Sequence, residues 1–304
     1  MPEIWFPNLG IEIAHLDRVA FTVFGRNVYW YGIFIGLAVV LGVLMAMKYA
    51  LMADTHLAAS NLAMKEAKRT GQSPDLYVDF IIYALIFAII GARLYYVIFS
   101  WDFYSAHPEK IFALREGGLA IYGGIIGGVV TAIVYCKRKG VNFWLLDTIA
   151  PCLAFGQMLG RWGNFFNREA FGGFTNGLLA MRLQVSQVRT SDISAEVMQH
   201  IVNYGGVDYI QVHPTFLYES LWNLCLFLLL IKFRPKKKFD GQVLGLYFLG
   251  YALGRVWIEG LRTDQLMFGP FAVSQLLSGG LIICAAIFLI RKGKQEKAKK
   301  ESES

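Results

Sequence analysis

Charged side chains are scarce in this chain. Of its 304 residues only 17% are Asp, Glu, Lys or Arg, whereas 56% are hydrophobic. Soluble globular domains are about a quarter charged, so this composition excludes an ordinary soluble protein and indicates an integral membrane protein. The alternating pattern of membrane-spanning strands is missing as well, and helices are therefore expected to cross the bilayer.

Cysteine is also rare, and its positions exclude a disulfide framework. The chain has four cysteines, all inside or at the ends of apolar stretches: Cys136, Cys152, Cys225 and Cys284. None stands in a loop expected to face outward, and no group of Cys and His residues has the spacing of metal ligands. We expect neither disulfides nor a bound metal.

Several motifs with a known chemistry are absent from the sequence. Acidic residues precede the first apolar stretch, and no basic leader or small-residue cleavage site is present, so we expect no cleaved signal peptide.

The chain has no phosphate loop of the Walker type, no acidic cage for Mg²⁺ and no matched Ser-His-Asp set. The sequence predicts a site that works without nucleotide, metal or other cofactor.

Apolar stretches of about 20 residues, the length that crosses a bilayer as a helix, are abundant. Seven are predicted, near residues 28–48, 76–99, 118–136, 142–161, 214–233, 243–261 and 271–290. Most of the 29 Lys and Arg residues follow the odd-numbered stretches, and such residues favour the cytoplasmic side. The predicted fold is an all-α integral membrane protein with seven transmembrane helices, its N-terminus outside and its C-terminus inside.

This topology divides the chain into five regions. They are an extracytoplasmic interfacial segment (1–27), transmembrane helices one to four (28–161), an extracytoplasmic cap (162–212), transmembrane helices five to seven (213–290) and a basic cytoplasmic tail (291–304). The net charge of +7 then serves mostly to anchor the cytoplasmic side on anionic membrane lipids. Nucleic acid is not an expected partner.

Local patterns add detail to these regions. Alternating apolar and polar residues predict strands over 181–188 and 209–212, and residues 191–202 suggest a short helix, so the cap should be small and mixed. In the N-terminal segment, 4–7 and 19–21 are expected at the headgroup level. The inner loop 49–75 resembles a basic surface helix, and the tail is expected to be disordered.

The most unusual stretch is 159–172, at the end of the fourth apolar stretch. It contains two Arg, one Glu, two Asn and three Gly in fourteen residues. A helix end needs only one or two such groups for capping. So many polar groups at the edge of the hydrocarbon indicate a site for a charged ligand.

The fifth and sixth stretches add polar residues at the same membrane level. Glu219 lies one turn into the fifth, and the sixth carries Tyr251, Arg255, Glu259 and Arg262 at spacings that place them on one helix face. Two arginines from different helices could hold one phosphodiester, because a guanidinium stays charged and donates two parallel hydrogen bonds. They could also stabilise a phosphate that leaves as an anion. The residues thus predict a site for an anionic lipid.

Two further stretches carry polar groups at membrane depth. Asp79 and Arg93 are fourteen residues apart and share one helix face, so each has a structural and a functional interpretation. The third stretch has six Gly between residues 117 and 128, which favours close helix packing. The hydroxyl of Tyr122 would project among these glycines.

In these residues the sequence resembles the prolipoprotein diacylglyceryl transferases. The matching motifs are Gly160-Arg161-Trp162-Gly163-Asn164-Phe165-Phe166-Asn167-Arg168-Glu169 with Gly172, Trp30-Tyr31-Gly32, Gly117-Gly118 with Tyr122-Gly123-Gly124, His213-Pro214-Thr215 with Leu217-Tyr218-Glu219, and Gly250-Tyr251 with Arg255, Glu259 and Arg262. They occur in the family's order over about residues 28–290.

The resemblance implies a reaction and its partners. The family transfers the diacylglyceryl group of phosphatidylglycerol to the lipobox cysteine of a bacterial prolipoprotein, so that a thioether forms and glycerol phosphate leaves. This is the first step of lipoprotein maturation, and it implies a bacterial cytoplasmic (inner) membrane with the site on the extracytoplasmic side. The implied partners are phosphatidylglycerol and the prolipoprotein signal peptide.

The resemblance also assigns roles to residues. By analogy Arg161 and Arg255 grip the phosphate. Asn164, Asn167, Glu169 and Gly172 shape the headgroup pocket, Tyr31 and Tyr251 line it, and Glu219, Glu259 and Arg262 order the arginines or gate access.

At Tyr122 the chain departs from many relatives, which carry a His that is a candidate base for the thiol. Tyr, with a reference pKa of about 10 against about 8.5 for a thiol, is a poor base. Tyr122 could instead donate a hydrogen bond to the substrate, His213 could serve as the base, or the thiolate already present at neutral pH could suffice. We favour the first option.

Two other functions compete with this interpretation. A transporter or channel would also place charges in the membrane, but it predicts polar residues through the full bilayer and often an internal repeat, and we find no repeat. A phospholipid-processing enzyme with another acceptor would share the same donor site, and only the family motif argues against it.

Overall fold

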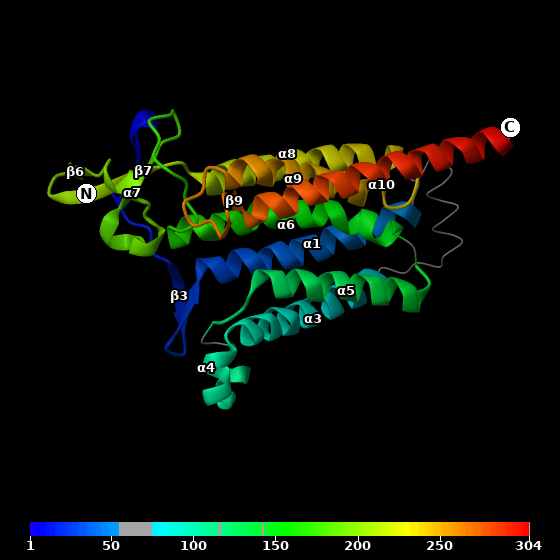
Figure 1. Ribbon diagram of the computed structural model, residues 1–304, viewed down its shortest axis with the longest axis horizontal. Helices are drawn as coiled ribbons and strands as arrows, with labels where there is room; N and C mark the ends of the chain where they lie inside the picture. Colours follow the sequence, from blue (N-terminus) through cyan, green and yellow to red (C-terminus); the bar gives the residue numbers. More distant parts are fainter. Residues whose placement is uncertain (55–74, 115–116, 142, 304) are drawn as a thin grey trace. The chain divides into compact units, whose positions relative to one another are not determined.

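The computed structural model describes residues 1–54, 75–114, 117–141 and 143–303 (Figure 1). Most of these residues are helical, as predicted. The chain forms two compact units, Met1–Gly42 with Ala150–Ser304, and Val43–Ile149. The predicted surface helix in the loop 49–75 lies largely outside the described residues.

Within the described residues, five helices contain segments long and apolar enough to cross a membrane. They are α1 (Trp30–Asp54), α3 (Asp75–Phe99), α5 (Ile121–Lys139), α8 (Thr215–Phe233) and α10 (Val273–Glu303). The chain therefore has the character of a multi-pass membrane protein. Short elements between these helices include α4 (Trp101–Ala106), α7 (Ala195–Met198), β8 (Met267–Phe268) and β9 (Phe271–Ala272).

The fourth and sixth predicted crossings are also helices, α6 (Trp144–Asn167) and α9 (Gln242–Glu259). Neither is among the five apolar segments. The reason is visible in their composition, because α6 contains Asp147, Pro151 and Arg161, and α9 contains Arg255 and Glu259. These residues lower the mean hydropathy of the two helices, so α6 and α9 are not apolar enough to count as membrane crossings by composition. Seven crossings therefore remain a prediction.

The C-terminal tail is helical, and the expectation of disorder was wrong. α10 continues to Glu303. Residues 291–303 are mostly Lys, Glu, Gln and Ala, which are strong helix formers. Lys297 and Glu301 also form an ion pair of 3.7 Å across one turn. Local propensity therefore extends the membrane helix beyond its apolar part.

The first unit contains a five-stranded antiparallel sheet in the order β2-β1-β5-β7-β6. Its strands are β1 (Ile4–Phe6), β2 (Ile11–Ile13), β5 (Met181–Gln184), β6 (Val202–Tyr204) and β7 (Val207–Val212). β7 confirms the strand predicted over 209–212, and α7 gives a shorter helix, Ala195–Met198, within the predicted 191–202. Of the strand predicted over 181–188, only Met181–Gln184 is β5, because Val185–Gln187 form a 3-10 helix. Figure 1 shows β6 and β7 at one end of this unit and the C-terminus at the other.

The N-terminal strand belongs to the core of this sheet. Ile4 and Phe6, expected at the headgroup level, are 0% and 8% exposed, and Ile4 pairs with Leu183. A separate hairpin, β3 (Val19–Val23) and β4 (Arg26–Tyr29), leads directly into α1. Residues from both predicted regions, 1–27 and 162–212, thus share one sheet.

The core under the sheet also fixes the helix ends that carry the polar stretch. Phe165 lies in the last turn of α6, Phe171 follows that helix, and Phe216 lies in the first turn of α8. All three pack in one cluster with sheet residues such as Leu183 and Ile210. Burial of a large apolar side chain stabilises a fold by roughly 1.5–3 kcal/mol. This cluster holds the end of α6 against the start of α8.

In the second unit, α3 and α5 pack at very short range. A Cβ on Gly123 would collide with the backbone of Gly91, and one on Gly127 with the backbone of Phe87. The close packing predicted from the glycines is confirmed.

The two polar residues of α3 have structural partners. Arg93 is 6% exposed and donates to the carbonyls of Ile111 (2.7 Å) and Gly117 (2.7 Å), as well as to those of Lys110 and Gly118. Asp79 lies 4.0 Å from Lys139. Of the two interpretations of Arg93, these contacts support the structural one, in which it organises the loop between α3 and α5.

Candidate active site

The end of α6 and the turn after it connect four polar side chains by hydrogen bonds. Arg161 Nη1 donates to Asn164 Oδ1 at 3.2 Å. Asn164 Nδ2 donates to Glu169 Oε1 at 2.9 Å, and Asn167 Nδ2 reaches the same oxygen at 3.2 Å. Glu169 thus fixes both amides, and their orientation passes along these hydrogen bonds to the guanidinium of Arg161.

A C-terminal cap of α6 places Glu169 in this position. The Arg168 amide donates to Phe165 O and the Glu169 amide to Asn164 O, both at 3.1 Å. Arg168 has φ of +56°, so the hydrogen bonds and the left-handed residue form a Schellman motif. Ala170 follows with φ of +58°, and its carbonyl accepts from the hydroxyl of Thr215. The chain reverses at once, so Glu169 points back to the helix that it follows.

Glu219 lies at the centre of three arginines, Arg161, Arg255 and Arg262, which together with it form the arginine cluster. Its side chain is 5% exposed and contacts three guanidinium groups from two other segments. Oε2 lies 2.7 Å from Arg161 Nη2, while Oε1 lies 3.0 Å from Arg255 Nη1 and 3.8 Å from Arg262 Nη1. A buried carboxylate needs such partners to stay charged. Glu219 therefore brings together arginines that lie about a hundred residues apart in the sequence.

A second carboxylate, Glu259, completes the arrangement on the α9 side. It pairs with Arg255 one turn earlier and lies 3.9 Å from Arg262 Nε. Ser274 at the start of α10 donates to it at 2.7 Å. Arg255 is therefore held between Glu219 and Glu259, which fixes the plane of its guanidinium.

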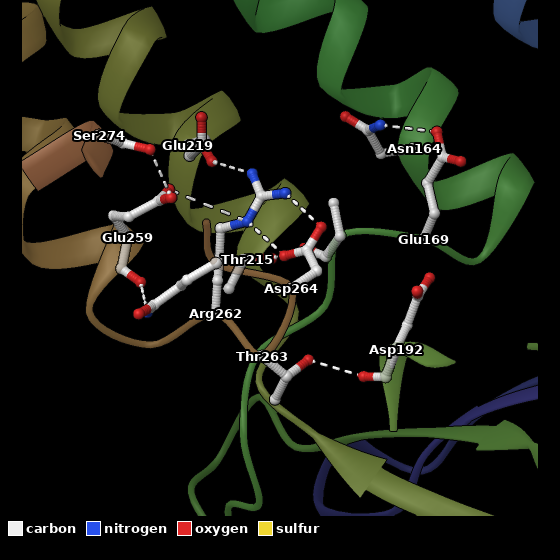
Figure 2. A network of polar contacts seen from close by, with 12 residues as sticks. Asn164, Glu169, Asp192, Thr215, Glu219, Glu259, Arg262, Thr263, Asp264 and Ser274 are labelled. Carbon is white, nitrogen blue, oxygen red and sulfur yellow. Dashed lines mark hydrogen bonds and ion pairs between the residues drawn. The ribbon is translucent and has the colours of Figure 1, made fainter. Parts of the chain in front are cut away.

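Arg262 lies among three carboxylates, as Figure 2 shows. It donates to both oxygens of Asp264, at 2.9 and 2.7 Å. Burial alone would lower the pKa of Arg262, but the hydrogen bond and charge of Asp264 and the charges of Glu219 and Glu259 raise it. Burial would raise the pKa of Asp264, and Arg262 outweighs this and lowers it. Both groups are charged at neutral pH.

Gly172 allows the loop after α6 to close against the other helices. Its amide donates to His213 O at 3.0 Å, and it forms an isolated bridge with Arg262. A Cβ at this position would lie 2.7 Å from Leu261 O and 2.8 Å from His213 Cβ. Any other residue would push the start of α8 and the end of α9 apart.

The predicted tyrosines occupy different places. Tyr31 lies against Gly163, where an added Cβ would be 2.6 Å from its ring, and is thus in the same unit as the arginines. Tyr251 stacks on Tyr247 with ring centroids 6.0 Å apart, one turn before Arg255. Tyr122 belongs to the second unit, where its ring lies 6.3 Å from that of Tyr95.

His213, the alternative base, lies beside the loop that Gly172 closes. Its Nδ1 lies 3.2 Å from the hydroxyl of Tyr218. Burial lowers the pKa of its imidazole, so the ring is neutral at pH 7 and one of its nitrogens can accept a proton.

Sequence reasoning missed Asp264 and Ser274. Asp264 stands only two residues after Arg262, and an Arg-x-Asp spacing could have suggested the pair. Ser274 carries no signal in the sequence, because only the packing of α10 beside α9 places its hydroxyl at Glu259.

The carboxylates at the site outnumber the guanidinium groups. Among its described residues, three guanidinium groups (Arg161, Arg255, Arg262) accompany four carboxylates (Glu169, Glu219, Glu259, Asp264). A phosphate would therefore compete with carboxylates for hydrogen bonds that already exist. Within the part of the chain that the structure describes, no three His, Cys, Asp or Glu side chains gather as metal ligands would.

These features define a helical membrane protein with a buried site built from arginines and carboxylates. The family model "Prolipoprotein diacylglyceryl transferase" matches residues 18–291. Proteins of Bacillus anthracis (strain A0248), Bacillus cereus (strain Q1) and Bacillus thuringiensis subsp. konkukian (strain 97-27), each named phosphatidylglycerol–prolipoprotein diacylglyceryl transferase, are 40% identical over 295 residues, covering 95% of this chain and 97% of each relative. The chain belongs to the prolipoprotein diacylglyceryl transferase family.

Proposed function

We propose that this protein transfers the sn-1,2-diacylglyceryl group of phosphatidylglycerol to the lipobox cysteine thiol of bacterial prolipoproteins. The thiol sulfur bonds to the glyceryl carbon next to the phosphate ester, the carbon–oxygen bond breaks, and the thiol proton is lost. Glycerol phosphate leaves with the bonding electrons. The observation that carries the proposal is the set of arginines that Glu219 gathers, together with the names of the relatives.

The arginines suit the leaving group. Arg161 and Arg255 would bind the phosphate oxygens, because each guanidinium offers a planar pair of donors. Negative charge grows on the phosphate oxygen as the carbon–oxygen bond breaks, and donors fixed in advance stabilise this charge. Arg255 is held in place before the lipid binds, because Glu219 and Glu259 pair with its guanidinium from two sides. Glu219 likewise holds Arg161.

The remaining residues would recognise the headgroup. Asn164 and Asn167, oriented by Glu169, would bind glycerol oxygens, and Gly172 would keep the loop close. Tyr31 and Tyr251 would line the pocket, while Arg262 would order the arginine cluster or gate access to it.

For the membrane topology, we infer seven transmembrane helices with the N-terminus outside and the C-terminus in the cytoplasm. α6 and α9 would complete the five apolar crossings, and the sheet would form an extracytoplasmic cap. The arginine cluster would then open to the outer side of the bacterial cytoplasmic membrane, where the prolipoprotein signal peptide presents its cysteine. The opposite placement of the sheet and the C-terminus in the first unit supports this (Figure 1).

The proposal is tested with membranes that contain the protein, phosphatidylglycerol and a lipobox peptide. The mass of the peptide should increase by one diacylglyceryl group. A peptide with Ser in place of the cysteine and vesicles of phosphatidylethanolamine are the matched controls and should give no product. An unchanged peptide would contradict the function. Consumption of phosphatidylglycerol without a change in the peptide would indicate another acceptor.

Substitution of Tyr122 and of His213 tests which of the two residues assists the substrate thiol. If the Tyr122 hydroxyl donates a hydrogen bond to the substrate, Tyr122→Phe should lower the transfer rate about two- to tenfold, because one such bond contributes roughly 0.5–1.5 kcal/mol. His213→Ala should keep most of the activity. Both variants are compared in the peptide assay after thermal unfolding has shown intact folding. Full activity of Tyr122→Phe with total loss in His213→Ala would transfer the role to His213.

A further inference from the structure

Arg168 occupies a backbone position that favours glycine. It is the left-handed residue of the cap that ends α6, with φ of +56°. L side chains rarely adopt this conformation, and glycine is the usual residue there. The cost of Arg at this position requires a compensating contact of its side chain.

That contact is with the N-terminal segment. The Arg168 side chain is 3% exposed, and its Nη2 lies 2.6 Å from Glu3 Oε2. The same nitrogen donates to Leu16 O. Glu3 precedes β1, and Leu16 follows β2, so the guanidinium binds both ends of the β1–β2 hairpin.

Further hydrogen bonds hold the Glu3 carboxylate next to Arg168. Its Oε2 also accepts from the Leu16 amide at 2.8 Å, and His15 Nδ1 lies 3.1 Å from Oε1. Burial alone would raise the pKa of Glu3, but the hydrogen bonds from Leu16 and Gln187 and the charge of Arg168 lower it. The carboxylate is therefore ionised at neutral pH.

From these contacts we infer that Arg168 is a positioning residue for the transfer reaction. Through Glu3 it ties the turn 167–170 to the N-terminal hairpin, and this turn places the Glu169 carboxylate where it accepts hydrogen bonds from Asn164 and Asn167. The described hydrogen bonds of the Arg168 side chain go to Glu3 and to the carbonyls of Leu16 and Phe166, none of which is a proposed substrate-binding group. The inference rests on the proposed function, because its readout is the use of phosphatidylglycerol.

Glu3→Gln is the first test, because it removes the charge and keeps the shape. A displaced turn would mis-set Asn167 and Glu169, so KM for phosphatidylglycerol should rise about tenfold, a modest share of the 100-fold effects that a misplaced group can have. The kcat at saturating lipid should change much less. Glu12→Gln is the matched control, since Glu12 is exposed on β2 of the same hairpin, and it should behave as wild type.

Two substitutions of Arg168 separate the backbone from the side chain. Arg168→Ala loses the link to Glu3 and keeps the unfavourable φ, whereas Arg168→Gly loses the link and removes the strain. We expect the larger rise in KM for Arg168→Ala and a partial recovery in Arg168→Gly. Adding Glu3→Gln to Arg168→Gly should have no further effect, since the link is already gone.

Hydrogen–deuterium exchange gives a second readout that needs no turnover. The amides of Arg168 and Glu169, which the cap protects, should exchange faster in Glu3→Gln and at the wild-type rate in Glu12→Gln. An unchanged exchange rate in Glu3→Gln, an unchanged KM despite lower thermal stability, or an equal effect of Glu3→Gln with and without Arg168 would overturn the inference. If wild type and Glu12→Gln are both inactive, the proposed function fails, and exchange alone decides the role of Arg168.

Discussion

Replacement of Glu219 by Ala is expected to abolish transfer and to destabilise the protein by several kcal/mol. The substitution leaves Arg161, Arg255 and Arg262 close together without their shared counter-charge. Removal of one partner from a buried ion pair typically costs about 3–5 kcal/mol. Glu219 is 4% exposed, so solvent cannot replace it. The arginines would separate, and the phosphate would lose its paired donors.

The measurement combines thermal unfolding in detergent with the peptide assay. Glu219→Gln is the informative companion, because it keeps one acceptor oxygen and removes the charge; it should be more stable than Glu219→Ala and still far less active than wild type. Glu196→Gln, at an exposed position of α7, serves as the control. Wild-type stability and activity in Glu219→Ala would show that the cluster does not depend on this carboxylate.

Arg255→Ala should reduce transfer about 100- to 1,000-fold, the loss typical of removing one preorganised donor from a developing anion. Arg255→Lys should fall between this variant and wild type, because lysine keeps the charge but lacks the planar fork. Arg255 also bridges Glu219 and Glu259. Its loss should therefore lower thermal stability as well, and more in the Ala variant.

To separate chemistry from folding, rates are compared only at temperatures where each variant is folded. Arg189→Ala, at an exposed position outside the cluster, is the matched control and should keep full activity. Equal rates for Arg255→Lys and wild type would mean that a positive charge alone suffices. Full activity of Arg255→Ala would remove Arg255 from the proposed mechanism.

The helices could be predicted from the sequence because hydropathy is a local property. The same signal is weak in α6 and α9, whose polar residues form the site, so these helices are visible as helices and not as apolar crossings. Local propensity also predicts β5 and β7. The tail shows the opposite error, because its high charge suggests disorder although the residues of 291–303 favour a helix.

Long-range pairing could not be read in the same way. Nothing near Ile4 predicts that it pairs with Leu183 in one sheet, because strand register depends on tertiary packing. For the site, the spacing predicted that Arg255, Glu259 and Arg262 share one helix face. This is confirmed for Arg255 and Glu259, whereas α9 ends at Glu259 and Arg262 lies beyond it. The central place of Glu219 follows only from the packing of α6, α8 and α9, which no single segment encodes.

The excess of carboxylates in the arginine cluster has a consequence for product release. A phosphate bound by Arg161 and Arg255 would displace Glu219 from part of their guanidinium groups, and α8 would hold the displaced carboxylate next to the anion. Like charges at such a distance repel each other. After the carbon–oxygen bond breaks, the departing phosphate monoester carries more negative charge than the lipid did, and the repulsion grows. The side chain that assembles the arginines would then expel the product and reset them for the next lipid.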